Sequence, residues 1–478
     1  MNHTPQDLRT QTLELIKDKA AAPVVELVQA WLASLDAEDL ADIAPDSLAP
    51  VLVDGFTQAA KRTGSGCQIA TLRYADGRGG MASALLILNE DMPYLVDSIV
   101  MAMRRQHLAV RGVMNTVLPV RRAADGSVEA VRQPGDPLES YVLVLLDEEL
   151  APEALAALVA ALETVARDAA VVRRDAAAMS ERLAAVATAA SQHGEEGAEV
   201  AAFLEWARSG GFEVFGYAYY RVKPGVRELE RDIPSRVGVL QDTAHPVYGT
   251  CLANIPGDFD TLAKRDSALS IVKADVAGTL HRDQQLDFIG VRDMDAQGAI
   301  LGEHCFVGLF TRAGNSTPLA ALPFARGRVA KVLSLAGVRQ QGFRAEKFRE
   351  ILESLPRTEA LEADLDWLAQ VCGSVVSLYK QPRTKVFARR DVYARHLNVL
   401  VYLPRERYSA SVASSLAKAL QASSGATHVS MQTLVADGPL ARVYLIAHAA
   451  RYPLDLETDI EQPLLGVLDG GHNGFAGV

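Results

Sequence analysis

The stretch TKVFARRDVYARHLNVLVYLPRERYSASVASSLAKALQASSGATHVSMQTLVADGPLARVYLIAHA at residues 384–449 decides the fold class of this chain. It holds two apolar, strand-like segments, a segment whose apolar residues have helical spacing, and two more strand-like segments. Ser409 is placed to cap the helix, Gly425 to end it, and Asp437-Gly438-Pro439 to turn between the last two strands. A helical segment at 456–468 follows, so the predicted order is strand, strand, helix, strand, strand, helix.

The same order is predicted nearer the N-terminus. Its segments are CQIATLRY (67–74), SALLILN (83–89), the helical MPYLVDSIVMAMRRQH (92–107), LAVRGVMNTVLPVRR (108–122) and SYVLVLLDEE (140–149). Alanine-rich helices are predicted from about Pro152 to about Ala190, with a break near Asp168. Two copies of one unusual order indicate a repeated module. Each copy predicts an antiparallel sheet with helices on one face, which places the chain in the α+β class.

Between the two modules the sequence predicts a central, mainly antiparallel sheet. Its predicted strands are FEVFGYAYYRV, RVGVLQD, SALSIVKAD, QLDFIGVRDMD and AILGEHCFVGLFTR, with a hairpin at Asp295-Ala296-Gln297-Gly298. Helices are predicted at 319–336, 344–354 and 359–380, and Asp7 and Asp36 are placed to cap helices before residue 67. The predicted domains are an N-terminal helical segment (1–66), the first module with its trailing helices (67–192), the central sheet unit (193–318), a helical connector (319–383) and the last module (384–478).

The composition excludes several classes of protein and of partner. The 478 residues include 48 Lys and Arg against 59 Asp and Glu, a net charge of −11 that argues against a nucleic-acid partner. The most apolar runs, at 84–88 and 141–146, are far shorter than the about 20 residues that span a bilayer, so no membrane partner is expected. Four widely spaced cysteines predict neither a disulfide framework nor a zinc site. The sequence therefore predicts a soluble, cytoplasmic protein.

Motifs of known catalytic or cofactor chemistry are not found in the sequence. It contains no G-x-x-x-x-G-K-[ST] phosphate loop, no H-E-x-x-H and no G-x-S-x-G. The glycine-rich DGGHNGFAG at 469–477 does not fit G-x-G-x-x-G, and no strand precedes it. We therefore predict no catalytic, cofactor-binding or metal-binding residue.

Three polar residues are weighed as catalytic candidates and set aside. His304 and Cys305 are adjacent in a predicted strand, so their side chains should point to opposite faces and cannot form a thiolate–imidazole pair. A buried structural cysteine is the simpler interpretation of Cys305. His281, in the turn His281-Arg282-Asp283, is more simply part of a solvated loop than of an anion site.

Two short segments remain as candidate effector or anion sites. At Asn89-Glu90-Asp91-Met92-Pro93, Asn89 or Asp91 can accept hydrogen bonds from a helix start, whose free N–H groups can also bind a carboxylate. Ordinary helix capping is the alternative. Arg389 and Arg390, followed by Asp391, can clamp an anion, and a surface ion-pair cluster is the alternative.

Taken in order, several long segments resemble the N-terminal part of the large bacterial NAD-dependent glutamate dehydrogenases. They are EDMPYLVDSIVMAM (90–103), LDFIGVRDMDAQGAILGEHCFVGLFTRA (286–313), ILESLPRTEA (351–360), VFARRDVYARHLNVLVYLPRERYS (386–409) and PLARVYLIA (439–447). The resemblance covers about 67 to 455. It implies two ACT-like modules flanking the central sheet.

The resemblance also implies a function for the longer parent protein. That parent would convert L-glutamate, NAD and water to 2-oxoglutarate, ammonia and NADH in a C-terminal dehydrogenase region that no segment here matches. NAD is thus expected for the parent only. This chain would be a regulatory and scaffolding portion, truncated at Val478. Its expected partners are the dehydrogenase region, further copies in a homo-oligomer, and an amino-acid effector.

One departure from the pattern bears on ligand binding. ACT modules that bind amino acids usually carry Gly after the Pro of the helix start, whereas this chain has Tyr94 there and Tyr408-Ser409 in the last module. Two alternatives remain open: a stand-alone amino-acid-sensing protein of the ACT type, and an independent enzyme that uses His281, His304 or Cys305.

Overall fold

The computed structural model describes most of the chain and divides into two compact units. Unit 1 comprises Met1–Arg174 and Gly278–Gln284, and unit 2 comprises Asp175–Ala277 and Gln285–Val478. The described residues are 5–36, 39, 43–62, 64, 66–249, 251, 252, 259–435, 438–448 and 454–470. Asp437 of the predicted turn and residues 471–477 of the glycine-rich tail lie outside them.

Unit 1 is built on a five-stranded antiparallel sheet with the order β1-β2-β5-β3-β4. Its elements are α1 (Pro5–Ile16), α2 (Ala22–Ser34), α3 (Pro45–Ala59), β1 (Gln68–Ala75), β2 (Met81–Glu90), α4 (Leu95–Arg105), β3 (Val110–Arg122), β4 (Val128–Val131), β5 (Leu138–Leu146) and the start of α5 (Pro152–Ala190). The apolar runs of β2 and β5 are buried along almost their whole lengths because these strands lie inside the sheet.

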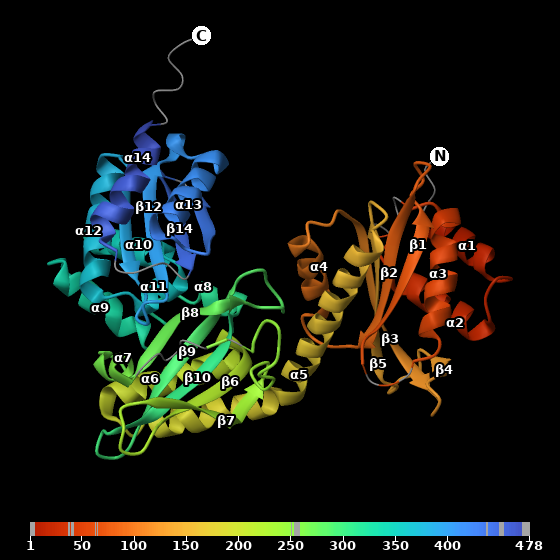
Figure 1. The fold of residues 1–478 in the computed structure, drawn as a ribbon, viewed down its shortest axis with the longest axis horizontal. Helices are drawn as coiled ribbons and strands as arrows, with labels where there is room; N and C mark the ends of the chain where they lie inside the picture. The colour runs from red at the N-terminus through yellow and green to blue at the C-terminus, as the bar shows by residue number, and fades with distance from the viewer. Residues whose placement is uncertain are drawn as a thin grey trace, which may run out of the picture. The chain divides into compact units, whose positions relative to one another are not determined.

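Helices cover both faces of this sheet. The helices α4 and α5 lie on one face, as the repeat predicts, and α1–α3 lie on the other (Figure 1). Trp31 of α2 and Phe56 of α3 pack with sheet residues such as Leu86 and Tyr141 in one core. The prediction of helices on one face only was therefore wrong, because the N-terminal helices bury the second face of the sheet.

The helix α5 is continuous over 39 residues, so the predicted break near Asp168 is wrong. Asp168 is buried, and its carboxylate accepts a hydrogen bond of 2.6 Å from the Thr279 hydroxyl. An Asp ends a helix when its side chain bonds to nearby backbone N–H groups. Here the carboxylate bonds to another segment of unit 1, and the helix continues.

Unit 2 contains the remaining elements. They are α6 (Gly194–Trp206), η2 (Ala207–Gly211), β6 (Phe212–Val222), β7 (Leu229–Gly238), α7 (Phe259–Lys264), β8 (Leu269–Ala277), β9 (Gln285–Met294), β10 (Ile300–Phe310), α8 (Arg312–Ser316), α9 (Ala325–Leu335), α10 (Phe343–Ser354), α11 (Arg357–Glu362), α12 (Leu365–Lys380), β11 (Lys385–Arg390), β12 (His396–Pro404), η3 (Arg405–Arg407), α13 (Ala410–Ser424), β13 (His428–Val435), β14 (Leu440–His448), η4 (Leu456–Glu461) and α14 (Gln462–Gly470).

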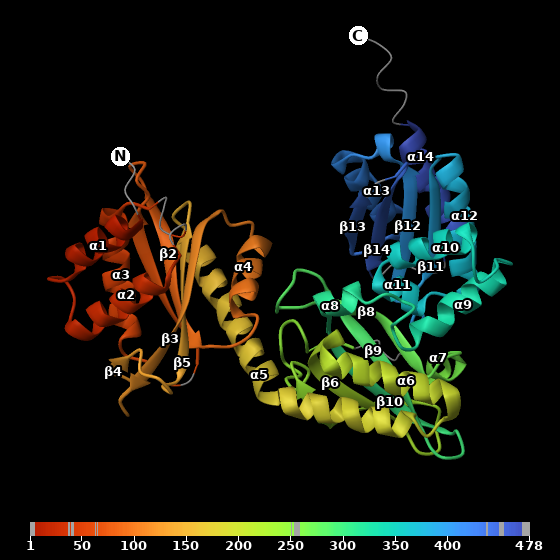
Figure 2. The same ribbon diagram turned by 180° about the vertical axis from the view of Figure 1, so that it is seen from behind.

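The central sheet is antiparallel, with the order β7-β6-β10-β9-β8, and α6 lies over one of its faces (Figure 2). The predicted hairpin is confirmed: the Asp295 carboxylate accepts the N–H groups of Gln297 and Ala299 at 2.9 and 2.8 Å. One strand was misplaced, because RVGVLQD supplies only the end of β7. The strand stops at Gly238, whose φ of 69° turns the chain.

The last module repeats the topology of the first. Its order β11-β12-β14-β13 corresponds to β1-β2-β5-β3, with a helix after the second strand and after the fourth. The predicted caps are confirmed: the Ser409 hydroxyl accepts the N–H of Val412, and Gly425 ends α13 with a φ of 61°. The helices α13 and α14 cover one face, and α10 and α12 pack on the other with Phe387 and Tyr444. The structure thus confirms the α+β class.

Several predicted helix boundaries differ from the observed ones, and the helix predicted at 319–336 begins only at Ala325. The predicted helix 359–380 is two helices, because Asp364 accepts the N–H groups of Asp366 and Trp367 and so starts α12 anew. Asp7 lies inside α1 rather than before it, and α3 follows Ala44 rather than Asp36. Any short polar residue before a helical segment is a candidate N-cap in the sequence. The local backbone conformation decides which of these residues caps a helix.

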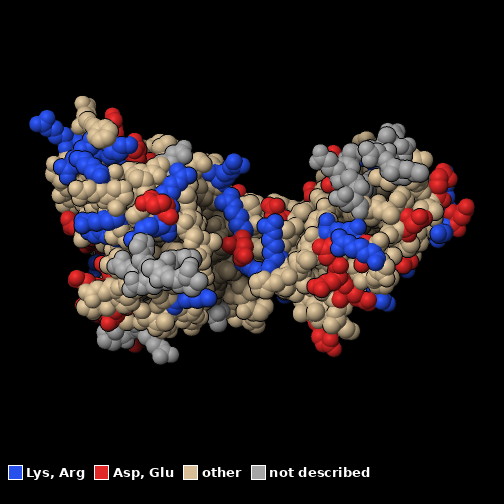
Figure 3. Space-filling model, turned by 90° about the horizontal axis from the view of Figure 1, so that it is seen from above, with Lys and Arg blue, Asp and Glu red and all other residues tan. Residues whose placement is uncertain are grey.

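The described surface is mixed in charge. Lys and Arg side chains are interleaved with Asp and Glu side chains on the face seen in Figure 3. Among the described residues, no helix is both long enough and apolar enough to span a bilayer.

Candidate functional site

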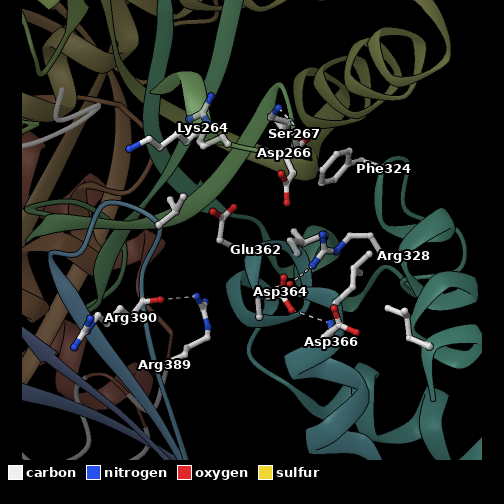
Figure 4. A pocket seen from close by; sticks show the side chains of 17 residues that line it. Lys264, Asp266, Ser267, Phe324, Arg328, Glu362, Asp364, Asp366, Arg389 and Arg390 are labelled. Atoms are coloured by element: carbon white, nitrogen blue, oxygen red, sulfur yellow. Dashed lines mark hydrogen bonds between the residues drawn. The ribbon is translucent and has the colours of Figure 1, made fainter. Parts of the chain in front are cut away.

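A cavity of about 510 Å³ in unit 2 is the candidate functional site. Its wall includes Asp266 after α7, Arg328 of α9, Glu362 at the end of α11, and Arg389 and Arg390 at the end of β11. The central sheet, the helical connector and the last module therefore all contribute to it. Figure 4 shows the Asp266 and Glu362 carboxylates and the Arg328 guanidinium directed toward the same space.

Glu362 is the most perturbed acid of this cavity. Its carboxylate accepts the N–H of Ile271 at 3.0 Å and the hydroxyl of Ser270 at 3.4 Å. It lies deep among protein atoms but keeps some accessible surface because it faces the cavity. Burial raises the pKa of Glu362 to about 7, although the Ile271 N–H and the nearby Arg389 favour its charged form. Near neutral pH, the Glu362 side chain is therefore protonated in part of the molecules and ionised in the rest.

Arg328 of α9 is one of the cationic side chains in the cavity wall. It donates to the carbonyl oxygens of Ala360, at 3.3 Å, and Ala363, at the end of α11. Burial lowers the pKa of Arg328, with a smaller opposing influence from Glu362. Within the described part of the chain, neither Arg328 nor Asp266 has an oppositely charged side chain within ion-pair distance. Arg328 and Glu362 therefore influence each other's pKa across the cavity without forming an ion pair.

Arg389 has a different role, because it is held in a buried ion pair. Its Nε and Nη2 donate to the two carboxylate oxygens of Glu359 at 2.6 and 2.9 Å. Glu359 also accepts hydrogen bonds from Asn398 and Tyr444, both at 2.8 Å, and its side chain is 0% exposed. This network joins α11 to the sheet of the last module.

The two predicted arginines thus both reach the cavity, but not as a pair. Arg389 is 12% exposed and bonded to Glu359, and Arg390 is exposed and donates to the carbonyl oxygen of Leu454. Asp391 pairs with Arg395 at 2.9 Å. The three charges therefore do not form one surface ion-pair cluster: Arg389 and Asp391 lie in buried ion pairs with different partners, and Arg390 is exposed.

The other predicted segment, around Asn89 and Asp91, does not cap a helix. The helix α4 begins at Leu95 after Tyr94, whose φ is 67°, and no side chain caps it. Asn89 is buried and accepts the N–H of the adjacent Glu90 at 3.0 Å. The Asp91 N–H donates to the carbonyl oxygen of Leu138 at 3.0 Å. The interpretation of this segment as an ordinary helix cap was therefore wrong, and the effector site at Asn89 and Asp91 stays a prediction.

The start of α4 is instead covered by His281. The imidazole packs on the ring of Tyr94 with centroids 4.7 Å apart, and the His281 N–H donates to the Ser98 hydroxyl at 2.8 Å. Asp283 of the same turn pairs with Arg105. The turn His281-Arg282-Asp283 thus packs within unit 1 rather than forming a solvated loop.

His304 and Cys305 lie on opposite faces of the central sheet, as predicted. Cys305 is fully buried, and burial raises the pKa of its thiol well above the usual value. His304 Nδ1 lies 2.9 Å from the Tyr217 hydroxyl, and burial lowers the pKa of the imidazole. A thiol held protonated and facing away from the imidazole cannot serve as its nucleophile.

Three histidines stand opposite one another across the last sheet: His396 on β12, His448 on β14 and His428 on β13. The His448 ring stacks on His428 with centroids 4.1 Å apart and meets His396 at 4.7 Å. Burial, and then the neighbouring His396 and His428, lower the pKa of His448 to about 2. No group of three His, Cys, Asp or Glu side chains arranged to hold a metal occurs among the residues that the structure describes.

Acid is expected to destabilise unit 2 through His448. Below about pH 6.5 the unfolded chain takes up a proton at this histidine, whereas folded His448 stays neutral to about pH 2. The contribution of neutral His448 to the free energy of unfolding is thus fully present above pH 6.5. Below that pH it falls by about 1.4 kcal/mol per pH unit. In urea unfolding at pH 6.5 and 4.5, His448→Gln should show a shallower loss of stability than the wild type, and His193→Gln should not. Equal losses in His448→Gln and the wild type would contradict the assignment.

Nothing in the sequence marked several of the cavity residues as members of a site. Asp266, Arg328 and Glu362 lie in three segments of the chain, and each is an ordinary charged residue of a helix or loop. Glu359 stood inside ILESLPRTEA, but nothing in that segment distinguishes a buried glutamate from an exposed one. Only packing brings these charges together.

Comparison with protein families gives three matches in order along the chain. Residues 27–162 match "Glutamate dehydrogenase, ACT1 domain", residues 322–381 match "Glutamate dehydrogenase, helical motif 1", and residues 385–467 match "Glutamate dehydrogenase, ACT2 domain". The first and last matches fall on the two modules with the same topology. The middle match falls on α9–α12, which carry Arg328, Glu359 and Glu362.

Curated relatives extend the similarity over most of the chain. The chain is 27% identical over 450 residues to the NAD-specific glutamate dehydrogenase of Halomonas elongata, covering 90% of this chain and 28% of the relative. It is 26% identical to the enzyme of the same name from Pseudomonas aeruginosa, with 76% and 23% covered, and 23% identical to that of Mycobacterium tuberculosis, with 84% and 24% covered. The chain thus spans about a quarter of the length of the curated relatives it matches.

Proposed function

Because this chain is an N-terminal region of the NAD-specific glutamate dehydrogenase family, we propose that it is the regulatory and scaffolding part of such an enzyme. The parent enzyme would oxidise L-glutamate to 2-oxoglutarate with reduction of NAD. This portion would hold and regulate the dehydrogenase region without performing the chemistry. Its partners would be that region, further copies of the parent and an amino-acid effector, in the cytoplasm.

The observation that carries the proposal is the order of the three family matches on a fold of two like modules. In unit 2 the last module is joined to the helical connector by buried contacts: Glu359 of α11 binds Arg389, Asn398 and Tyr444. A scaffold requires such rigid junctions between its parts.

The residues described here do not fit NAD. A dinucleotide site needs a glycine-rich turn between a strand and a helix, so that the backbone can approach the pyrophosphate. The corresponding turns here carry Tyr94, packed on His281, and Tyr408-Ser409, where Ser409 caps α13. All paired strands of the described sheets are also antiparallel. We therefore derive no catalytic step from this chain.

A steady-state assay tests the proposal. The purified chain, with L-glutamate and NAD, should produce no NADH above the blank. The full-length NAD-specific glutamate dehydrogenase of Pseudomonas aeruginosa serves as the positive control under the same conditions. Turnover by this chain comparable to that of the control would overturn the proposal and favour an independent enzyme.

A further inference from the structure

The strand β13 forms an open edge of the sheet in the last module. Within the part of the chain that the structure describes, β13 pairs with β14 on one side and with no strand on the other (Figure 2). The first module has the same strand order, but there the corresponding strand, β3, also pairs with β4. An open edge presents backbone N–H and C=O groups to which a further strand can bond. The last module therefore offers a strand position that the first module fills with its own chain.

The sequence of β13 lacks the features that usually protect an exposed edge. Proteins prevent unwanted strand pairing with charged residues, proline or bulges at such edges. The segment His428–Val435 reads HVSMQTLV, which contains no Asp, Glu, Lys, Arg or Pro, and it pairs with β14 without a bulge. The other outer strands of the described sheets each carry a charged residue: Arg73 in β1, Glu129 in β4, Glu230 in β7, Lys273 in β8 and Lys385 in β11. Among the described edges, β13 is thus the one best suited to bond another strand.

Apolar side chains are exposed on both faces of β13. Met431, Leu434 and Val435 are 42%, 38% and 42% exposed. Met431 and Val435 belong to the face that α13 and α14 cover, because their partners on β14 lie in the core beneath those helices. Leu434 lies on the opposite face, since side chains alternate along a strand. A strand added at this edge would therefore bury apolar surface on both faces besides forming backbone hydrogen bonds.

We propose that β13 pairs with β13 of a second copy of this chain, antiparallel about a two-fold axis, so that the two sheets of the last modules continue into each other. Charge favours a second copy as the occupant. Like charges on directly opposite residues destabilise a strand pair, and an uncharged strand brings none together when it meets its own copy. A two-fold contact of this kind also closes after two copies, so no β13 edge is left for further, fibre-like growth.

The size of the contact sets the expected strength of the dimer. The 8 residues of β13, at about 3.4 Å each, form an edge of about 27 Å. A contact of one strand edge lies at the small end of specific interfaces. We therefore expect a weak dimer of this chain, with a Kd of about 10–100 μM. The meaning of the pairing for the parent enzyme rests on the scaffolding function proposed above, but the pairing itself does not.

Sedimentation velocity of the purified chain, from about 1 to 200 μM, tests the pairing and should show a monomer converting to a dimer and to nothing larger. Gln432 is exposed and lies near the middle of β13, hence near the two-fold axis. Gln432→Lys and Gln432→Glu should each weaken dimerisation at least tenfold, because each brings like charges together. An equimolar mixture of the two variants should dimerise at least tenfold more tightly than either alone. The matched control is Thr71→Lys, at an exposed position of the edge strand β1, which should change nothing.

Amide hydrogen exchange gives a second readout. The N–H groups of β13 that face the open edge should gain protection as the protein concentration rises, whereas those of β11, at the opposite edge of the same sheet, should not. A chain that stays monomeric at about 200 μM, wild-type dimerisation by both Gln432 variants, or unchanged protection of β13 would each overturn the proposal. The NADH assay is independent of these results, so failure of the pairing is distinguishable from failure of the proposed function.

Discussion

Replacing Glu359 with alanine is expected to destabilise unit 2 by about 3–5 kcal/mol, because it leaves a buried guanidinium without its partner. Glu359 is 0% exposed and accepts two hydrogen bonds from Arg389 and one each from Asn398 and Tyr444. Alanine accepts none of them. The Arg389 charge would then remain in a site with 12% exposure and without its ion-pair partner.

Urea unfolding followed by tryptophan fluorescence measures this effect. Trp367 is a suitable reporter because the Arg389 guanidinium lies 5.7 Å from its ring centroid. The matched control is Glu350→Ala, which removes an exposed glutamate of α10 paired only with Lys347 and should change stability by less than about 0.5 kcal/mol. If the two variants unfold at the same urea concentration, the buried pair does not hold the last module in place.

Replacing Trp31 with alanine is expected to cost unit 1 about 3–5 kcal/mol, the range for removal of a large buried aromatic side chain. Trp31 is 0% exposed, and its indole N–H donates to the carbonyl oxygen of Tyr141 at 3.2 Å. Its ring meets Phe56 edge-on at 5.6 Å, and Phe56 stacks on Tyr141 at 5.5 Å. The change would leave a cavity between α2 and the sheet.

Amide hydrogen exchange is the appropriate measurement, because the remaining tryptophans belong to unit 2. The amides of β2 and β5 should lose protection in Trp31→Ala, while those of β12 and β14 keep it. Leu138→Ala, which trims a side chain that is 51% exposed, is the control and should leave all four strands protected. Unchanged protection of β2 and β5 in Trp31→Ala would show that the N-terminal helices contribute little to unit 1.

Much of the fold was predictable because strands and helices of this chain carry clear local patterns. The order of elements in both modules, the cap at Ser409, the stop at Gly425 and the hairpin at Asp295 all follow from neighbouring residues. Two of the errors have a common cause. The break at Asp168 and the capping by Asn89 or Asp91 were inferred from side chains that can bond locally but bond elsewhere, or do not act, in the folded chain.

By itself, the sequence determined the α+β class and the repeated module, because both depend on residue spacing along the chain. It also carried the resemblance to the family, because that depends on which residues occur in long segments taken in order. The tertiary structure decided which charged side chains are buried and which residues are their partners. It paired Arg389 with Glu359, turned Cys305 away from His304, and gathered Asp266, Arg328 and Glu362 around one cavity. Electrostatic interactions depend on distance and solvent exposure, and neither quantity is set by position in the sequence.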